Sequence, residues 1–145
     1  MRHAIGFIPL LISILVIGCT KSTPEQAILD NIDAIEAAIQ DKNNSDVREH
    51  VSKQFRGGGG STQVSAENLQ AYLAGVFLRY AHIGVIISNT KVEVSEFDPY
   101  SATSTSSVAV TGAENIVPDS ARLYTVHATW RLESEQWKLI ELKWN

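Results

Sequence analysis

Cysteine is almost absent from this chain of 145 residues, because Cys19 is the only one. A single thiol cannot close an intramolecular disulfide, so the folded part must be stabilised by packing alone. It also cannot form a metal site built from several cysteines, and the four histidines show no metal-ligand spacing. No metal and no cofactor are therefore expected.

Basic residues are outnumbered, with 12 Lys and Arg against 16 Asp and Glu and a net charge of −4. A nucleic-acid partner calls for a basic surface patch, so this composition argues against one. The glycine run at 57–60 lacks the Lys and Ser/Thr of a phosphate-binding loop and does not follow a predicted strand. We interpret residues 57–62 as a flexible connection.

Apolar runs are short, and the one that stands out lies at the N-terminus. Residues 4–18 are Ile/Leu-rich, follow Arg2 and contain no acidic residue. The run is shorter than the roughly 20 apolar residues that span a bilayer. A basic start, an apolar stretch of this length and a small residue at its end are typical of a secretory signal peptide. We predict a signal peptide over residues 1–18.

The residues at the end of this leader, 16–19, read Val-Ile-Gly-Cys. The pattern resembles the lipobox of bacterial lipoproteins, which implies that Cys19 becomes the first residue after cleavage and carries several acyl chains. Two or more chains hold a protein firmly on a membrane, so the expected location is the cell envelope, lipid-anchored. Thr20 in place of Asp implies the outer membrane, facing the periplasm, if the source is a didermic bacterium. The alternative is a free or buried cysteine behind an export signal.

The remainder divides into a lipidated tether at 19–23 and one domain at 24–145. Thr23, Pro24 and Gln26 have the spacing of an N-cap, a first-turn proline and a capping box, which predicts a helix over 24–41. The isoleucines of this segment recur every three or four residues and line one helical face.

Two more helices and four strands are predicted after this first helix. The helices are 45–52, capped by Ser45, and 66–81, capped by Ser65 and followed by Gly84 as a left-handed C-terminal residue. From residue 85 the apolar period changes to two, which predicts strands at 85–97, 103–111, 121–132 and 137–144. Helices followed by strands indicate an α+β fold, with the N-terminal helices packed on one face of an antiparallel four-strand sheet.

The last two strands also predict a register, because a slip of one residue exchanges the faces of a strand. If Leu132 faced Trp137, the charged residues Glu141 and Lys143 would enter the core unpaired, which is costly. A loop at 133–135 avoids this outcome. It pairs Val126 with Leu142 and Ala128 with Ile140, sets His127 beside Glu141 on the outer face, and buries Trp130 and Trp144.

The order of elements and the closing hairpin resemble a known superfamily. The hairpin reads Tyr124-x-Val126-x-x-x-Trp130 and then Trp137-Lys138-Leu139-Ile140-x-x-Lys143-Trp144. It is similar to the last hairpin of nuclear-transport-factor-2-like domains, also called the cystatin-like cone. The resemblance implies a strongly bent sheet that closes on the helices as a cone, with space for a pocket. It implies no single function, because members include ketosteroid isomerases, dehydratases, polyketide cyclases and pure binding or assembly domains.

Aromatic residues are the candidates for lining that pocket: Tyr72, Phe77, Tyr80, Tyr124 and Trp130. Aromatic walls with a few hydroxyls suit an apolar small molecule. The alternative is that the five side chains fill the cone and leave no cavity. Isomerase-type members use an Asp base beside a Tyr and a second acid. The patterning places no acid beside these tyrosines, so no catalytic residue is assigned.

The histidines have ordinary surface explanations. His50 is expected to face solvent on the short helix, and His82 to cap the long helix before the sheet. His127 with Glu141 would form a cross-strand pair or part of a homodimer contact through the outer sheet face. The expected function is a membrane-anchored small-ligand-binding or accessory module. The alternative is a small isomerase- or dehydratase-type enzyme that acts on an apolar substrate.

Overall fold

A six-stranded sheet carries the helices in the computed structural model, which describes residues 21–113 and 120–145. The predicted signal peptide, Cys19 and residues 114–119, between two of the predicted strands, lie outside these residues. The elements follow the chain in this order: α1 (Pro24–Gln40), α2 (Asn44–Glu49), β1 (Val51–Gly59), β2 (Thr62–Ser65), α3 (Leu69–Arg79), β3 (His82–Val94), β4 (Ser101–Ala113), β5 (Ser120–Glu133) and β6 (Gln136–Trp144).

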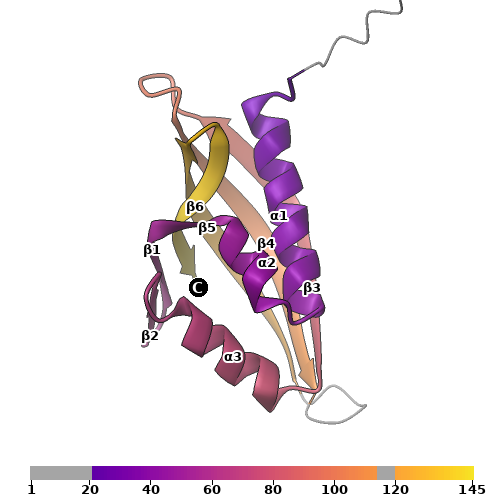
Figure 1. The fold of residues 1–145 in the computed structure, drawn as a ribbon. Helices are drawn as coiled ribbons and strands as arrows, with labels where there is room; N and C mark the ends of the chain where they lie inside the picture. Colours follow the sequence, from indigo (N-terminus) through magenta and orange to yellow (C-terminus); the bar gives the residue numbers. More distant parts are fainter. Residues whose placement is uncertain (1–20, 114–119) are drawn as a thin grey trace, which may run out of the picture.

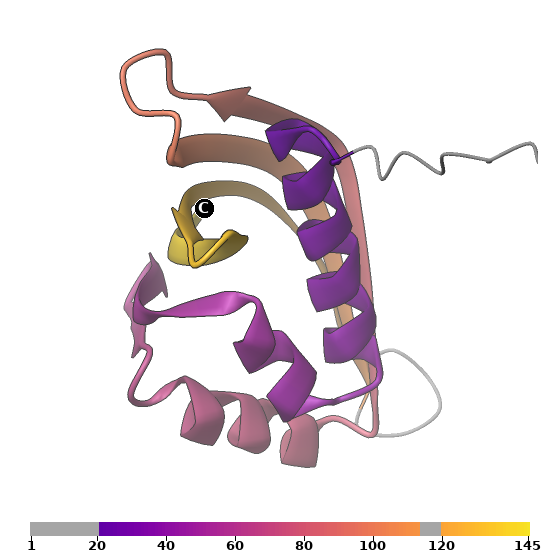
Figure 2. The same ribbon diagram turned by 45° about the horizontal axis from the view of Figure 1, so that its top comes forward.

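The strands lie in the order β2-β1-β6-β5-β4-β3. Every neighbouring pair is antiparallel except β1 and β6, which are parallel. Figures 1 and 2 show α1 lying against the sheet, which bends around it, with α2 and α3 closing the lower end. The α+β class is confirmed, but the described sheet has six strands where four were predicted. No helix in the described ranges has both the length and the apolar character to cross a membrane.

Helix α1 forms as its sequence predicts. The Thr23 hydroxyl accepts a hydrogen bond from the backbone N–H of Gln26 at 3.2 Å, with Pro24 in the first turn. The Gln26 side-chain amide donates forward to Asp30 instead of reaching back to the cap, so the prediction of a capping box is wrong. Ile28 and Ile32 are buried against the sheet, and the remaining isoleucines of this face pack against the same core.

Residues 57–59 belong to strand β1, so the prediction of a flexible connection is wrong. All three pair with β2, and Gly57 and Gly58 also pair with β6 on the other side. A Cβ atom at Gly59 would lie inside the Trp144 indole and 2.5 Å from its carbonyl oxygen, and one at Gly57 would lie 2.8 Å from the Phe55 ring. Glycine is present because side chains from elsewhere in the chain press against this backbone. Gly60, at φ +57, takes the turn into β2.

The other helix boundaries shift because nearby polar side chains take different partners. Asn43 rather than Ser45 caps α2, since its side chain accepts from the N–H of Asp46 at 3.3 Å. Ser65 does not cap α3; its own N–H donates to Asn68 Oδ1 at 2.7 Å, and the helix starts afterwards. Gly84 does not end α3 but lies in β3 opposite Thr111, whose hydroxyl occupies the space of a side chain.

The closing hairpin differs from its predicted register. Ser134 and Glu135 form a two-residue turn with positive φ, so Leu132 does face Trp137. A β-bulge at position 140 then shifts the pairing by one residue. Beyond it, the pairs are Ala128 with Leu142, Val126 with Trp144, Thr129 with Glu141 and His127 with Lys143. The bulge therefore keeps apolar residues opposite one another without the longer loop, and the predicted pairs are each wrong by two residues.

The core is centred on Trp130, which is 1% exposed. Its indole N–H donates to the hydroxyl of Ser104 at 2.9 Å, so the one polar atom of this side chain has a partner. Strand β4 carries small buried side chains, Ala102, Ser104 and Ser106, which leave the volume that the indole occupies. Of the other predicted core residues on this hairpin, Leu142 packs against the core, while Val126 and Trp144 are half-buried.

Helix α1 also covers part of the sheet edge formed by β3. The Glu36 carboxylate accepts from the backbone N–H of Ile87 at 3.2 Å, and the Gln40 amide donates to the carbonyl of Val85 at 2.9 Å. The two side chains therefore take the place of a neighbouring strand, which protects an edge that would otherwise pair with another chain.

Candidate functional site

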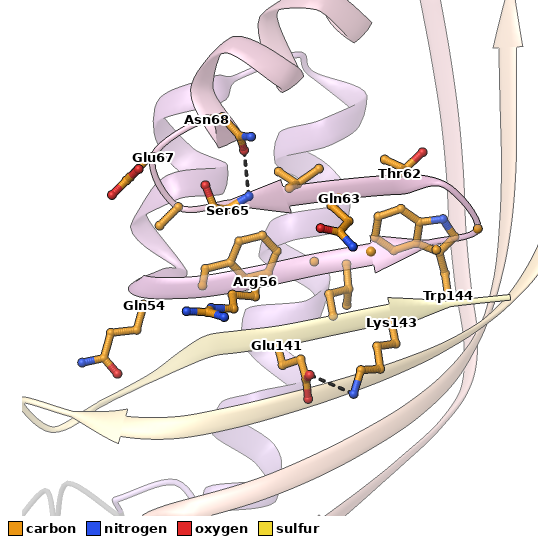
Figure 3. A pocket seen from close by; sticks show the side chains of 18 of the residues that line it. Gln54, Arg56, Thr62, Gln63, Ser65, Glu67, Asn68, Glu141, Lys143 and Trp144 are labelled. Carbon is orange, nitrogen blue, oxygen red and sulfur yellow. Dashed lines mark hydrogen bonds and ion pairs between the residues drawn. The ribbon is translucent and has the colours of Figure 1, made fainter.

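An open hollow of about 1180 Å³ lies along the β1–β2 hairpin and the end of β6. We call it the hairpin pocket; residues 53–60, 62–68 and 141–144 line it. Figure 3 shows Trp144 and Gln63 near the tip of the hairpin, with Glu141 and Lys143 on the neighbouring strand. None of the five aromatic residues predicted to line a pocket belongs to it.

The apolar part of the hairpin pocket is built around Trp144. The bulge in β6 places Leu142 and Trp144 on the same side as the buried Phe55 of β1. Gly57 and Gly59, facing the same side, leave bare backbone for the indole to lie against. Trp144 itself is half-buried.

The polar rim of the pocket carries charges of both signs. Glu141 pairs with Lys143 at 2.8 Å and accepts a long hydrogen bond from Thr129. Within the described part of the chain, Lys53 and Arg56 have no ion-pair partner and are exposed. Arg56 and Glu141 alternate with Gly57 and Leu142, so they project from the face of the β1–β6 ladder opposite to the Trp144 ring. The pocket lining therefore offers an apolar surface for a ring or hydrocarbon body and, separately, cations for an anionic group.

The five predicted pocket residues lie on separate parts of the domain. On α3, Tyr72 is exposed and Phe77 packs against the core. Tyr80 follows the helix and lies flat on Gly112 of β4, where a Cβ atom would be 2.9 Å from its ring. On β5, Tyr124 is half-buried opposite Val108, and Trp130 is fully buried. The structure thus brings Tyr80 onto the sheet and places Trp130 in the core.

His50 has a different setting from the one predicted, since it is half-buried at the end of α2. Its Nδ1 lies 2.6 Å from the side-chain oxygen of Asn31, whose amide donates to the carbonyl of Trp137 at 3.0 Å. The Asn31 oxygen can only accept, so His50 Nδ1 carries the proton. Burial, and secondarily the charge of Lys138, lowers the pKa of His50. The histidine, held by an amide, tethers α2 to α1 and β6, and no carboxylate among the described residues hydrogen-bonds to it.

The remaining histidines lie on the surface. His82 starts β3 and is exposed, so it does not cap α3. His127 is exposed, lies opposite Lys143, and has its Nδ1 3.2 Å from the hydroxyl of Thr105. Among the described residues, no group of three or more His, Cys, Asp or Glu side chains could hold a metal ion.

Comparison with known proteins identifies the fold. No protein-family model matches the sequence, and no curated protein sequence matches it. Among solved structures, a candidate scytalone dehydratase from Novosphingobium aromaticivorans is similar, with a TM-score of 0.75 at 12% identity over 83% of this chain and 82% of that one. A candidate dehydratase from Streptomyces avermitilis has a TM-score of 0.73 at 12% identity over 84% and 96%.

A nuclear-transport-factor-2-like protein from Cytophaga hutchinsonii has a TM-score of 0.72 at 15% identity, over 86% of this chain and 98% of that one. At these identities the likeness defines the fold alone. The chain therefore has the nuclear-transport-factor-2-like, or cystatin-like, fold that the sequence predicted.

Proposed function

We propose that the chain is a cell-envelope lipoprotein, anchored through acylated Cys19, whose domain binds a small ligand in the hairpin pocket. The anchor rests on the lipobox-like residues 16–19 behind an apolar leader. The observation that carries the binding role is the half-buried Trp144, which lies on bare glycine backbone in a pocket that Lys53 and Arg56, two exposed cations, also line.

The chemistry of the interior favours binding over catalysis. General acid–base catalysis needs a titratable group within hydrogen-bond reach of the reacting atoms. In the described residues the buried polar side chains are three serines, and each hydroxyl has a partner inside the chain: Ser52 with Glu133 at 2.8 Å, Ser104 with Trp130, and Ser106 with Thr90 at 2.9 Å. The alternative, an isomerase- or dehydratase-type enzyme, draws on the names of two structural neighbours and would need an acid or a histidine in the cone.

The ligand class follows from the two sides of the pocket. The exposed part of the Trp144 ring offers stacking or apolar contact, which suits a flat ring or a hydrocarbon body. The Arg56 guanidinium, in register with Glu141 on β6, can hold a carboxylate or phosphate in a forked contact. We therefore expect an amphipathic small molecule with one anionic group.

Native mass spectrometry of the protein purified from its own envelope tests this proposal. A co-purifying small molecule should be present in the unmodified protein and absent from Arg56→Ala, which removes an exposed charge and leaves the fold intact. Leu78→Ala, on the exposed side of α3, is the matched control and should keep the ligand. A ligand retained in Arg56→Ala, or an empty pocket in every preparation, would contradict binding at this site.

The outer sheet face, directed away from α1, supports a second copy of the chain as a further partner. Ile86, Ala109 and Leu123 form one row across β3, β4 and β5, and both large side chains are exposed. The rows on either side are uncharged: Gly84, Thr111 and Ala121, and Ser88, Ser107 and Thr125. A twofold axis would place this row on itself without burying a charge, so we propose a homodimer through this face.

A further inference from the structure

The loop between β3 and β4 holds two aromatic side chains out of the domain. Phe97 is 97% exposed and Tyr100 is 59% exposed. The loop backbone is nonetheless fixed by its own polar groups. Ser95 Oγ accepts from the N–H groups of Phe97 and Asp98, at 3.3 and 3.2 Å, and Asp98 Oδ1 accepts from the N–H of Tyr100 at 3.0 Å. The aromatic groups are therefore presented by a preformed turn, and little ordering is needed on contact.

This loop lies at the end of the molecule where α1 begins. The carbonyl of Tyr100 accepts from the N–H of Leu132 at 2.8 Å, next to the β5–β6 turn. At that turn, the Glu135 carboxylate lies 4.0 Å from the ammonium group of Lys21, just ahead of α1. Figure 1 shows the β3–β4 loop and the start of α1 together at the top of the molecule.

The chain between the proposed anchor and α1 is too short to move this end far from a membrane. Four residues lead from Cys19 to the helix cap Thr23. A fully extended chain of that length spans at most roughly 14 Å. If Cys19 is acylated, as the proposed function requires, the first turn of α1 stays close to the bilayer surface, and the β3–β4 loop at the same end lies within reach of it.

The charges at this end point to an apolar rather than an electrostatic contact. Two of the cations are paired with acids, Lys21 with Glu135 and Arg131 with Asp98 at 3.8 Å. Glu25 and Glu96 add negative charge nearby. Attraction to anionic lipids requires an excess of Lys and Arg, which this end lacks. Aromatic side chains gather at the membrane–water interface because they have an apolar body and, in tyrosine, a polar tip.

We propose that residues 97–100 form a second membrane contact beside the lipid anchor. Phe97 enters the boundary between headgroups and acyl chains, and Tyr100 lies at the headgroup level. An acyl anchor alone leaves the domain free to tumble, whereas an anchor plus this loop fixes its orientation. The far end then points into the aqueous compartment. It includes the C-terminal part of α3, where the Phe77 carbonyl meets Lys42 at 3.2 Å, beyond the other end of α1.

The lone cysteine makes a direct test available. With Cys19 acylated, Phe97→Cys provides a single thiol for an environment-sensitive fluorophore, and Leu78→Cys provides the matched control at the far end. Leu78 is 87% exposed, so both labels are open to solvent in the domain itself. The lipidated proteins are reconstituted into phosphatidylcholine vesicles and titrated with a water-soluble quencher. We expect the label at 97 to be quenched several-fold more weakly than the label at 78.

The outcomes separate this inference from the proposed function. Equal quenching at the two positions in vesicle-bound protein overturns the loop contact and leaves the anchor intact. Protection at 97 that rises with the density of protein on the vesicle identifies a second copy as the occupant, and also overturns it. Failure of the unmodified protein to bind vesicles, or equal binding by Cys19→Ser, contradicts the proposed lipid anchor itself. Protection that is unchanged when a third of the lipid is anionic, or in high salt, supports an apolar contact.

Discussion

Replacing Gly59 with alanine should destabilise the domain, although glycine-to-alanine changes in flexible segments are usually harmless. The new Cβ would overlap the Trp144 indole and lie 2.5 Å from the Trp144 carbonyl oxygen. The indole can rotate away, but the carbonyl belongs to the β6 backbone and cannot move without disturbing the sheet. Overpacking of this kind costs about 1–3 kcal/mol, a large share of the roughly 5–15 kcal/mol that stabilises a domain.

Thermal unfolding followed by circular dichroism measures the effect. A loss of about 2 kcal/mol corresponds to a decrease in Tm on the order of 5–10 °C for a domain of this size. Gly75→Ala is the matched control, because its new Cβ on α3 would meet no other atom within 4 Å. It should be neutral or stabilising by up to about 1 kcal/mol. Equal Tm values for Gly59→Ala and the unmodified protein would refute the assignment of residues 57–59 to a packed strand.

Three further results are expected. Trp130→Ala should cost about 3–5 kcal/mol, because it empties the core and leaves the Ser104 hydroxyl without its donor; a Tm change of a degree or so in calorimetry would contradict this. The pKa of His50 is lowered in the folded state, so its contribution to stability is present above the unfolded pKa of 6.5 and is lost as pH falls through the folded pKa. His50→Gln should flatten this part of the denaturation profile between pH 7 and 5. Leu123→Glu should convert a dimer to a monomer in analytical ultracentrifugation, with Leu78→Glu as the unaffected control; a dimer that persists would exclude the outer sheet face.

The sequence was informative wherever a local signal decides the structure. Thr23 and Pro24 determine the start of α1, and its isoleucines determine which face is buried. The prediction for the glycine run was wrong because the side chain that requires glycine there, Trp144, lies far along the chain. The bulge at Ile140 does have a local signal: the inward apolar residues of β6 change phase between Leu139 and Leu142. Read as one regular strand, the same residues predict the wrong pairs.

The candidate site was harder to predict than the fold. Which aromatic side chains share a cavity depends on how the sheet bends and on which strands continue it, and β1 and β2 were not expected at all. The alternation of apolar residues along the last strand assigned Trp144 to the core, which describes half of its packing. Its other half, the contact with the glycine backbone of β1, exists only because β1 pairs with β6.

The parallel pairing of β1 with β6 has a consequence for how the chain folds. Gly57 and Leu142 are partners across this ladder, although most of the domain separates them in sequence. Such a contact closes a very long loop, so it is expected to form late and slowly. Until β6 is in place, the β1–β2 hairpin has only itself to pair with, and an isolated hairpin is marginal in water. The pairing of β1 with the β5–β6 hairpin thus completes the domain last, and a chain that ends before Gln136 should remain an unfinished, protease-sensitive intermediate.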